Sequence, residues 1–271
     1  MMWRVFCLMV FLSLPGCSIT HALRVQDGQR VSLEQMLVEL GATPLVFVGE
    51  SHDSSEHHDL QLRVIEGLHA TGTPLAIGLE MFQLDSQQVL DDWVTGQLPE
   101  AQLVRAYQAN WRNLNWTLYR AIFVYARDQH LPMVALNVPQ AIIQKVGRGG
   151  FTALSDADLQ ALPPGATHAL SDTELDCMAQ VYTGHATQRQ AMFNLCEAQA
   201  LRNRVMARAI ERYQAHAPDT RMVVLAGALH AHRWLGVPAR LQDQRYKVLL
   251  PPMPDVDLHQ PQAIGADYLL N

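Results

Sequence analysis

The chain has 271 residues, of which 49% are apolar and 17% charged, and its formal net charge is −6. This length fits one large domain, or one domain that carries a small lobe, and the apolar content suffices for a sizeable core. The acidic balance, without any long basic run, argues against a nucleic-acid partner.

The first 16 residues predict a lipoprotein signal peptide. Arg4 gives the segment its positive start, and residues 5 to 14 are apolar but too few to span a membrane. The sequence LPGC at residues 14 to 17 is typical of a bacterial lipobox, so we expect acylation of Cys17 and a firm lipid anchor. Ser18 after this cysteine favours the outer membrane. The alternative is a plain signal peptide with an incidental cysteine.

The chain that remains, residues 17 to 271, holds two more cysteines, Cys177 and Cys196. An exported protein meets an oxidising compartment, so this pair is a candidate disulfide. Closing such a short loop would stabilise the fold by about 3 kcal/mol.

Four nearly continuous apolar runs predict strands that are buried on both faces, at residues 45–48, 75–79, 133–136 and 222–225. Residues 54–70 and 116–129 have the apolar spacing of helices. This alternation predicts an α/β fold, in which a mostly parallel sheet flanked by helices forms a large lobe.

Two segments interrupt the alternation. Residues 85–115 look helical and are rich in Gln and Trp, and residues 151–212 contain LPPG followed by helical stretches near 173–183 and 187–213. We expect both segments to form a small helical lobe inserted into a single α/β domain. The Pro-rich segment after Pro251 is expected to be irregular.

Polar side chains follow the predicted strands. They are Glu50 and His52, then Glu80, then Asn137, then His230 and His232. Because ligands bind beyond the carboxyl ends of parallel strands, we expect these groups to converge on one site. Either His57 or its neighbour His58 can turn back into the same cleft from the start of the next helix. Imidazole and carboxylate together suit divalent metal binding or general base catalysis.

The simpler alternative is that His57, His58 and His69 are solvated helix residues and that His232 belongs to a turn. Glu50 and Glu80 are harder to explain in this way, because a carboxylate at the end of a buried strand loses its hydration unless it is paired. The chain contains no Walker phosphate loop, no GxSxG and no HExxH motif.

The segments FVGESHDSSEHHDLQL, AIGLEMFQLDSQQVLDDWVTG, NWTLYRAIFVYARDQHLPMVALNVP, EAQALRNRVMA and LAGALHAHRWLGVPARL follow one another over roughly residues 31 to 245. The chain thereby resembles the haem-binding lipoproteins of the ChaN type, in a wider group with an erythromycin-esterase and Tiki-protease-like core. The family's GExH element falls on Glu50 and His52, its LEMF element on Glu80, and its late GxxH element on His230. Asn203 stands where the AQ-xx-RD element usually has an aspartate, which puts in doubt any ion pair or metal role at that position.

The resemblance implies ferric haem bound between the two lobes, in iron uptake. It further implies that a tyrosine holds the iron, and that a partner's histidine helps with the propionates in a homodimer that encloses two haems. We favour Tyr182 as the ligand, with His185 on the same helical face, and Tyr107 as second choice. Ordinary helix packing would explain Tyr182 equally well. His57 is a further candidate haem contact.

Two other functions stay open. The wider group includes metal-dependent peptidases and esterases, so Glu50, His52, Glu80 and His230 could be the metal-binding and catalytic residues of a divalent-metal hydrolase. A lipoprotein that merely tethers a partner would explain the lipobox but not the polar strand ends. For the haem-binding function, an outer-membrane haem receptor is a candidate partner, and the body would face the periplasm or the cell surface.

Overall fold

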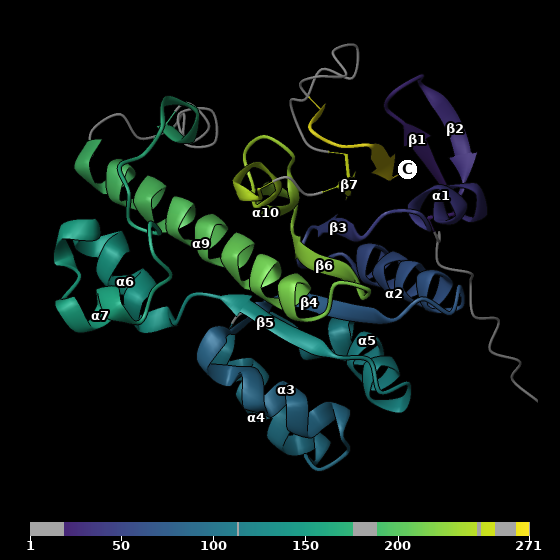
Figure 1. Cartoon of the computed structure of the whole chain (residues 1–271), viewed down its shortest axis with the longest axis horizontal. Coiled ribbons are helices and arrows are strands. Elements are labelled where there is room, and N and C mark those ends of the chain that lie inside the picture. Colours follow the sequence, from purple (N-terminus) through teal and green to yellow (C-terminus); the bar gives the residue numbers. More distant parts are fainter. Residues whose placement is uncertain (1–18, 113, 176–188, 243–244, 253–263, 271) are drawn as a thin grey trace, which may run out of the picture.

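The computed structural model describes residues 19–112, 114–175, 189–242, 245–252 and 264–270. Within them lies an eight-stranded sheet with the strand order β2-β1-β8-β7-β3-β6-β4-β5 (Figure 1). The strands are β1 His21–Arg24, β2 Gln29–Ser32, β3 Leu45–Glu50, β4 Leu75–Gln83, β5 Met133–Asn137, β6 Arg221–Gly227, β7 Tyr246–Leu250 and β8 Tyr268–Leu270. Strands β8, β7, β3, β6, β4 and β5 pair in parallel, whereas β1 is antiparallel to both β2 and β8. The predicted α/β fold with a mostly parallel sheet is confirmed.

Helices cover both faces of this sheet. They are α1 Leu33–Leu40, α2 Ser55–His69, α3 Gln87–Val94, α4 Glu100–Asn110, α5 Trp116–Asp128, α6 Gln140–Gly149, α7 Asp156–Gln160, α9 Arg189–His216 and α10 Ala228–Ala231. In the central strands, alternate side chains serve opposite faces: Val46 and Val48 join the core beneath α1 to α5, whereas Leu45 and Phe47 join the core beneath α9. Both faces are therefore apolar, which explains why these strands read as continuous apolar runs.

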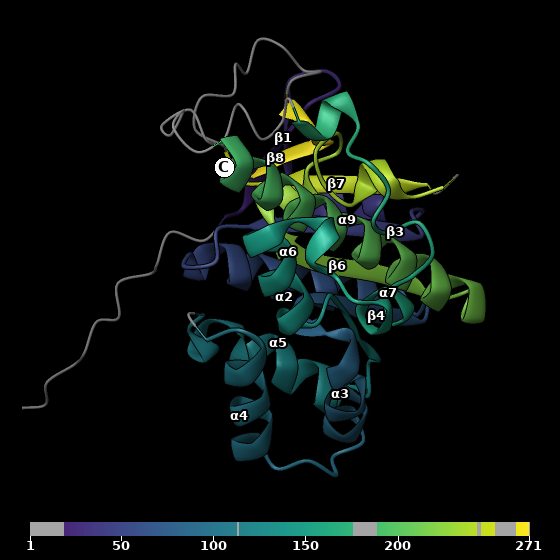
Figure 2. The same cartoon turned by 90° about the vertical axis from the view of Figure 1, so that its left-hand side faces the viewer.

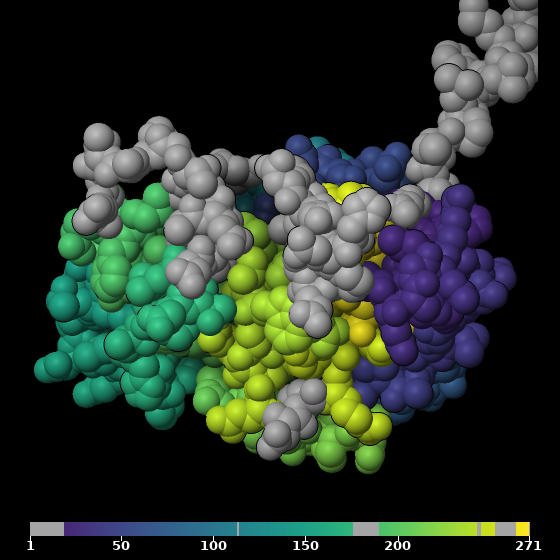
Figure 3. All heavy atoms as spheres, turned by 90° about the horizontal axis from the view of Figure 1, so that it is seen from above, coloured from purple at the N-terminus to yellow at the C-terminus, as the bar shows by residue number. Residues whose placement is uncertain are grey.

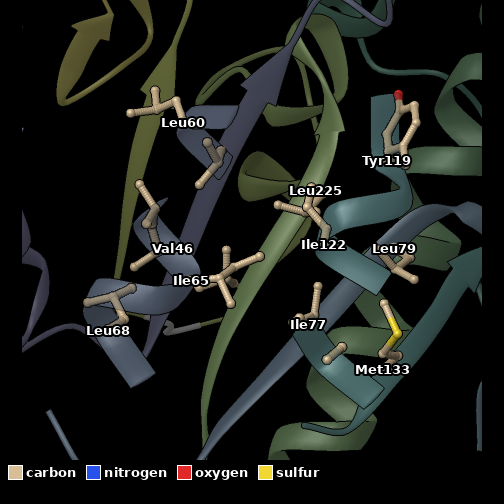
Figure 4. Packing of buried hydrophobic residues seen from close by; sticks show 14 of the residues in the cluster. Val46, Leu60, Ile65, Leu68, Ile77, Leu79, Tyr119, Ile122, Met133 and Leu225 are labelled. Atoms are coloured by element: carbon tan, nitrogen blue, oxygen red, sulfur yellow. The ribbon is translucent and has the colours of Figure 1, made fainter. Parts of the chain in front are cut away.

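The first of these cores ends close to the carboxyl ends of the strands. Figure 4 shows its side chains between the sheet and helices α2 and α5. The Tyr119 ring stands at the end of this cluster that lies towards the strand arrowheads. The Tyr119 hydroxyl therefore lies near the carboxyl ends of the strands, where a site is expected.

The two segments expected to form one helical lobe instead pack on opposite faces of the sheet. Helices α3 and α4, from residues 85–115, join the core beneath α1 to α5, whereas α9 packs with α6 on the other face. Both views show α3 and α4 on the opposite side of β4 from α9 (Figure 1, Figure 2). Apolar periodicity identifies a helix but not the sheet face that it covers, so the sequence alone leaves the face of each segment open.

The remainder of 151–212 is only partly described. The expected helix at 187–213 is α9, while most of the stretch 173–183 lies outside the described residues. Seen from above, the segment after β6 lies between α6 and α7 on one side and the β1–β2 hairpin on the other (Figure 3). The C-terminal segment expected to be irregular contributes β8, which completes the sheet between β1 and β7.

One buried arginine ties the amino-terminal helices to the sheet. Arg221, at the start of β6, donates hydrogen bonds to the carbonyl oxygens of Thr43 (3.1 Å), Leu68 (3.4 Å) and Gly41. Burial lowers the pKa of its guanidinium below the ordinary value. The last carbonyls of a helix lack intrahelical partners, so this side chain supplies donors where α1 and α2 end.

Several predicted features fall outside the described residues. These are the signal peptide of residues 1–16, the lipidation site Cys17 and one half of the expected disulfide, Cys177. Cys196 is buried in α9, and its pairing with Cys177 stays a prediction. In the part of the chain that the structure describes, no helix is both long and apolar enough to cross a membrane.

Candidate functional site

The carboxyl ends of four neighbouring strands carry the predicted polar residues. Glu50 ends β3 and lies beside Gly227, which ends β6, while Asn137 ends β5. Glu80 lies in β4, where the pairing with β5 shifts register between Leu79 and Gln83. Such bulges often re-aim a side chain next to a binding site. The structure thus brings the predicted strand-end residues together.

Glu50 is the centre of a buried hydrogen-bond network. Its carboxylate is 2% exposed and accepts hydrogen bonds from the Tyr119 hydroxyl, from Gln61 Nε2 (2.6 Å) and from His52 Nδ1 (2.7 Å). His58 Nδ1 lies 3.5 Å from the second carboxylate oxygen. Burial alone would raise the pKa of Glu50, but the His52 hydrogen bond and the charges of His58 and His52 hold it below its usual value. Glu50 is therefore a carboxylate at neutral pH.

His52 connects this network to the solvent side of the site. Its side chain is 34% exposed, and its ring centroid lies 5.5 Å from that of Trp111. A Cβ atom at Gly227 would come within 3.0 Å of His52 Cε1, so glycine allows this close approach. Burial opposes protonation, but the Glu50 hydrogen bond and the charge of Glu80 raise the pKa of His52 above its usual value. The ring that faces outward is thus favoured as a cation.

A second carboxylate–imidazole pair lies alongside. Glu80 Oε2 accepts a hydrogen bond from the Gly227 amide (2.7 Å), and Glu80 Oε1 is 3.4 Å from His230 Nε2. His230 Nδ1 lies 2.6 Å from Asn203 Oδ1 and 3.3 Å from Gln199 Nε2. Burial lowers the pKa of His230 despite the nearby Glu80 charge. Asn203 contacts this histidine without bringing a negative charge to it. The pKa values of His230 and His52 therefore shift in opposite directions, downward for His230 and upward for His52.

The strand ends open into a cavity of about 600 Å³. It is lined by Glu80, Met81, Gln83, Ala109, Asn110, Trp111, Arg112, Asn137, Val138, Gln140, Ala141, Gln144 and Arg202. Its walls therefore come from the end of α4, from α6 and from α9, which belong to opposite faces of the sheet. The Cζ atom of Arg202 lies 5.8 Å from the Trp111 ring centroid. The cavity combines an aromatic and aliphatic surface with two arginines and several amides.

Hydrogen bonds join the cavity walls to one another. Gln83 donates its backbone N–H to Asn110 Oδ1 (2.8 Å), and its side-chain oxygen accepts from the Gln140 amide (2.7 Å). Asn137 Nδ2 donates to the Glu80 carbonyl oxygen (2.9 Å). The bulged end of β4 therefore links the end of α4, the start of α6 and the end of β5, which fixes the shape of the cavity.

Other sequence-predicted residues have different roles in the structure. His57 is half-buried and accepts a hydrogen bond from the Ser51 amide through Nδ1 (3.0 Å), outside the Glu50 network. Burial lowers the pKa of His57, and the nearby His58 adds to this effect. His232 is buried and accepts from the Trp234 amide (3.3 Å), as expected of a residue that holds a turn.

Of the two candidate tyrosines, Tyr107 lies in the described part of the chain and Tyr182 does not. Tyr107 is 0% exposed in the core beneath α1 to α5, and its hydroxyl has no hydrogen-bond partner among the described residues. Burial raises the pKa of Tyr107 above its usual range. The structure therefore does not support Tyr107 as a ligand that reaches the cavity. Tyr182 and His185 lie outside the described residues.

The described part of the chain does not provide a set of side chains that could bind a divalent metal. No group of three or more His, Cys, Asp or Glu side chains there has the arrangement needed to hold an ion. Glu50 and Glu80 instead form separate pairs with His52 and His230.

Sequence reasoning missed several members of the site. Tyr119 and Gln61 both bind Glu50, but both look like parts of amphipathic helices. The available signal was Gln61 itself, a polar residue on the apolar stripe of α2 that also carries Ile65 and Leu68. For Trp111, the sequence predicts only that it belongs to the helical segment 85–115.

A family model described as "Haem-binding uptake, Tiki superfamily, ChaN" matches residues 36–241. The chain belongs to this family. The match spans both strand-end pairs and every wall of the cavity. The predicted resemblance to haem-binding proteins of the ChaN type is confirmed.

Solved structures share the fold of this ChaN-family chain. Cofacial haem binding is described for ChaN of Campylobacter jejuni, which is 18% identical and aligns with a TM-score of 0.72 over 92% of this chain and 95% of its own. The type III effector HopBA1 is 11% identical with a TM-score of 0.55 over 87% and 90% of the two chains. The erythromycin esterase EreC, in its open conformation, is 14% identical with a TM-score of 0.52 over 93% and 82%.

A curated relative is the chloroplastic protein RETICULATA-RELATED 5 of Arabidopsis thaliana, which is 24% identical over 213 residues. The match covers 73% of this chain but only 29% of that protein. The ChaN-family chain therefore spans less than a third of the length of this relative.

Proposed function

We propose that this protein binds ferric haem in the cavity at the strand ends and acts in haem and iron uptake. The observation that carries the proposal is the cavity of about 600 Å³ that lies within the region matched by the haem-binding family. Its size falls in the range of about 300–1,000 Å³ that is usual for small-molecule and cofactor sites.

The cavity lining suits the chemistry of haem. A haem is a flat apolar ring with two carboxylates on one edge. Trp111, Ala109 and Ala141 offer apolar contact, and Arg112 and Arg202 offer positive charge. Aromatic rings favour stacking on such a flat surface, and guanidinium groups favour carboxylates. These residues would hold the ring and its acidic edge.

The iron ligand of this proposal is Tyr182, with His185 as a donor to a propionate. An anionic phenolate oxygen suits ferric iron, and axial-ligand identity tunes what haem does. A tyrosinate would favour storage or relay of ferric haem.

The proposal includes an acylated Cys17 in the bacterial outer membrane and a homodimer that binds two haems. The lipobox sequence of residues 14–17 supports the anchor, and the cofacial haem binding described for the C. jejuni protein supports two haems per assembly. An outer-membrane haem receptor would supply or receive the ligand. Replacing Cys17 with serine should release the protein from membranes, and unchanged fractionation would contradict the anchor.

A second candidate is a hydrolase at the same strand ends; its divalent-metal version would need ligands beyond the described residues, which provide no group of three. The two carboxylate–imidazole pairs, Glu50 with His52 and Glu80 with His230, favour it, because such pairs supply acid–base groups. Stoichiometric metal in the native protein, with esterase or peptidase turnover abolished by Glu50→Gln, would promote this function over haem binding.

Titration with ferric haem tests the first candidate directly. Wild-type protein should give saturable binding, a high-spin tyrosinate-type spectrum and a shift toward dimer in sedimentation. Tyr182→Phe should lose that spectrum, whereas Tyr107→Phe should keep it because Tyr107 is buried in the core. Absence of saturable binding to the wild type would refute the haem proposal.

A further inference from the structure

A second cavity, of about 350 Å³, borders α9 and, among the described residues, shares no lining residue with the strand-end cavity. In Figure 1 the segment after α7, which forms one of its walls, runs alongside α9. Three of the residues that line it are arginines, Arg204 and Arg208 from α9 and Arg240 from the short helix Pro238–Arg240, and one is Glu174. Small-molecule sites usually measure about 300–1,000 Å³, so this cavity suits a small ligand.

The two carboxylate oxygens of Glu174 have unequal surroundings. The side chain is 6% exposed, and Oε2 accepts hydrogen bonds from the Ser171 amide (2.8 Å), the Ser171 hydroxyl (3.1 Å) and Arg204 Nη2 (2.8 Å). Burial would raise the pKa of Glu174, but the Ser171 amide and Arg204 hold it below its usual value. Oε1 is buried as well, yet it accepts no hydrogen bond from any described residue. A charged oxygen is thus left without a donor.

Arg240 has the complementary deficit. Its Nη2 atom lies 3.5 Å from Glu174 Oε1, which is an ion pair but too long and too poorly aligned for a hydrogen bond. Its Nε atom is buried and donates to no described residue. A buried polar atom without a partner costs free energy, so such atoms usually face a water molecule or a ligand. Here one acceptor and one donor are both unpartnered at the same cavity.

The charges around the cavity favour a ligand with a single negative charge. Arg204 donates to three backbone carbonyl oxygens of the segment after α7 as well as to Glu174, so it holds the wall in place. Arg208 Nη1 is 2.5 Å from Glu211 Oε2. The guanidinium groups of Arg204, Arg208 and Arg240 therefore face two carboxylates, which leaves one positive charge unbalanced.

We propose that this cavity binds a phosphate group that keeps one proton, either as inorganic phosphate or as a phosphate monoester. Its P–OH group donates to Glu174 Oε1, and its other oxygens accept from the guanidinium groups of Arg240 and Arg208. A phosphate group can keep this proton because its second pKa is about 6. Sulfate and carboxylate ligands hold no proton at neutral pH and would set a lone pair against Glu174. The inference is independent of haem binding, because no residue of the strand-end cavity takes part.

The test is calorimetric titration of the purified protein with inorganic phosphate, methyl phosphate and sulfate at neutral pH and constant ionic strength. We expect wild type to bind the better of the two phosphates at least about 10-fold more tightly than sulfate, because sulfate has no proton to donate to Glu174. Glu174→Gln should remove this preference, since the new amide donates to an unprotonated oxygen while its own oxygen still accepts from Ser171 and Arg204. Arg240→Gln should weaken the binding of each anion about 10-fold.

Arg212→Gln is the matched control. Arg212 is exposed on α9 and does not line the cavity, so the same loss of charge there should leave all three affinities unchanged. The two phosphates distinguish the possible sources of the ligand. Tighter binding of methyl phosphate would assign the site to a phosphate monoester, whereas tighter binding of inorganic phosphate would assign it to the free ion.

Two results would overturn the inference. Equal affinity of the wild type for phosphate and sulfate would mean that no proton of the ligand is recognised by Glu174. Absence of saturable binding of either phosphate at millimolar concentration would mean that the two unpartnered atoms face water only. If Glu174→Gln does not fold, as circular dichroism would show, the wild-type comparison and Arg240→Gln decide.

Discussion

Replacing Tyr119 with phenylalanine removes one hydroxyl from the buried network around Glu50. The hydroxyl donates to Glu50 Oε1, and the ring itself is 0% exposed in the core, so phenylalanine can fill the same space. A hydrogen bond to a charged group contributes about 1.5–3 kcal/mol. We therefore expect Tyr119→Phe to lower the free energy of unfolding by about 2 kcal/mol and the melting temperature by roughly 4–8 °C.

Tyr107→Phe provides the matched control. The two rings are neighbours, with centroids 5.8 Å apart, and Tyr107 is equally buried, but its hydroxyl has no partner among the described residues. Removing an unpaired buried hydroxyl recovers its desolvation cost, so this variant should be as stable as the wild type or more stable. Thermal and urea unfolding followed by circular dichroism measure both. Equal losses in the two variants would refute the assigned role of the Tyr119 hydroxyl.

Three further variants test the site and the fold. Glu50→Gln should lower the pKa of His52, which NMR measures. In the wild type, the Glu50–His52 pair stabilises the fold fully below pH 6.5, and this contribution is lost as the pH rises through the raised pKa of His52. If the stability of Glu50→Gln depended on pH in the same way, this role of the pair would be contradicted. Gly227→Ala should cost about 1–3 kcal/mol in urea unfolding because the new Cβ crowds the His52 ring, whereas Gly147→Ala, with open space around it, should cost nothing. Arg221→Met should cost about 3 kcal/mol or more in thermal unfolding, since three carbonyls where α1 and α2 end lose a donor; a loss below about 1 kcal/mol would be inconsistent with the role of these hydrogen bonds.

The sequence predicted the centre of the sheet but not its edge. Strands β3, β4, β5 and β6 are buried on both faces, and continuous apolar runs report such burial directly. Strands β1, β2 and β8 have only three or four residues each, and β2 is half exposed, so no long pattern marks them. The strand β8 also follows a Pro-rich stretch, which favours an irregular interpretation.

At the site, the sequence indicated the residues that stand at strand ends, because a charged group next to a buried strand loses its hydration and therefore needs a partner or a ligand. Glu50, His52, Glu80 and His230 were found in this way. The partners that orient them, such as Tyr119, come from helices whose side chains are chosen mainly for packing. The hydrogen bond from Tyr119 to Glu50 joins residues that are 69 positions apart, so no local sequence pattern predicts it.

In the sheet, strands from the start of the chain pair with strands from its end, so the sheet cannot form until late in synthesis. Strand β3, residues Leu45–Glu50, lies between β6 and β7, which begin at Arg221 and Tyr246, and β1 lies between β2 and β8. Synthesis from the N-terminus therefore produces a central strand long before either of its neighbours exists. Such non-local pairing slows folding, because the loop-closure entropy must be overcome before the contacts form. A chain that stops before Arg221 would leave both edges of β3 unpaired and prone to aggregation, so the strand ends that build the site can assemble only when nearly the whole protein is present.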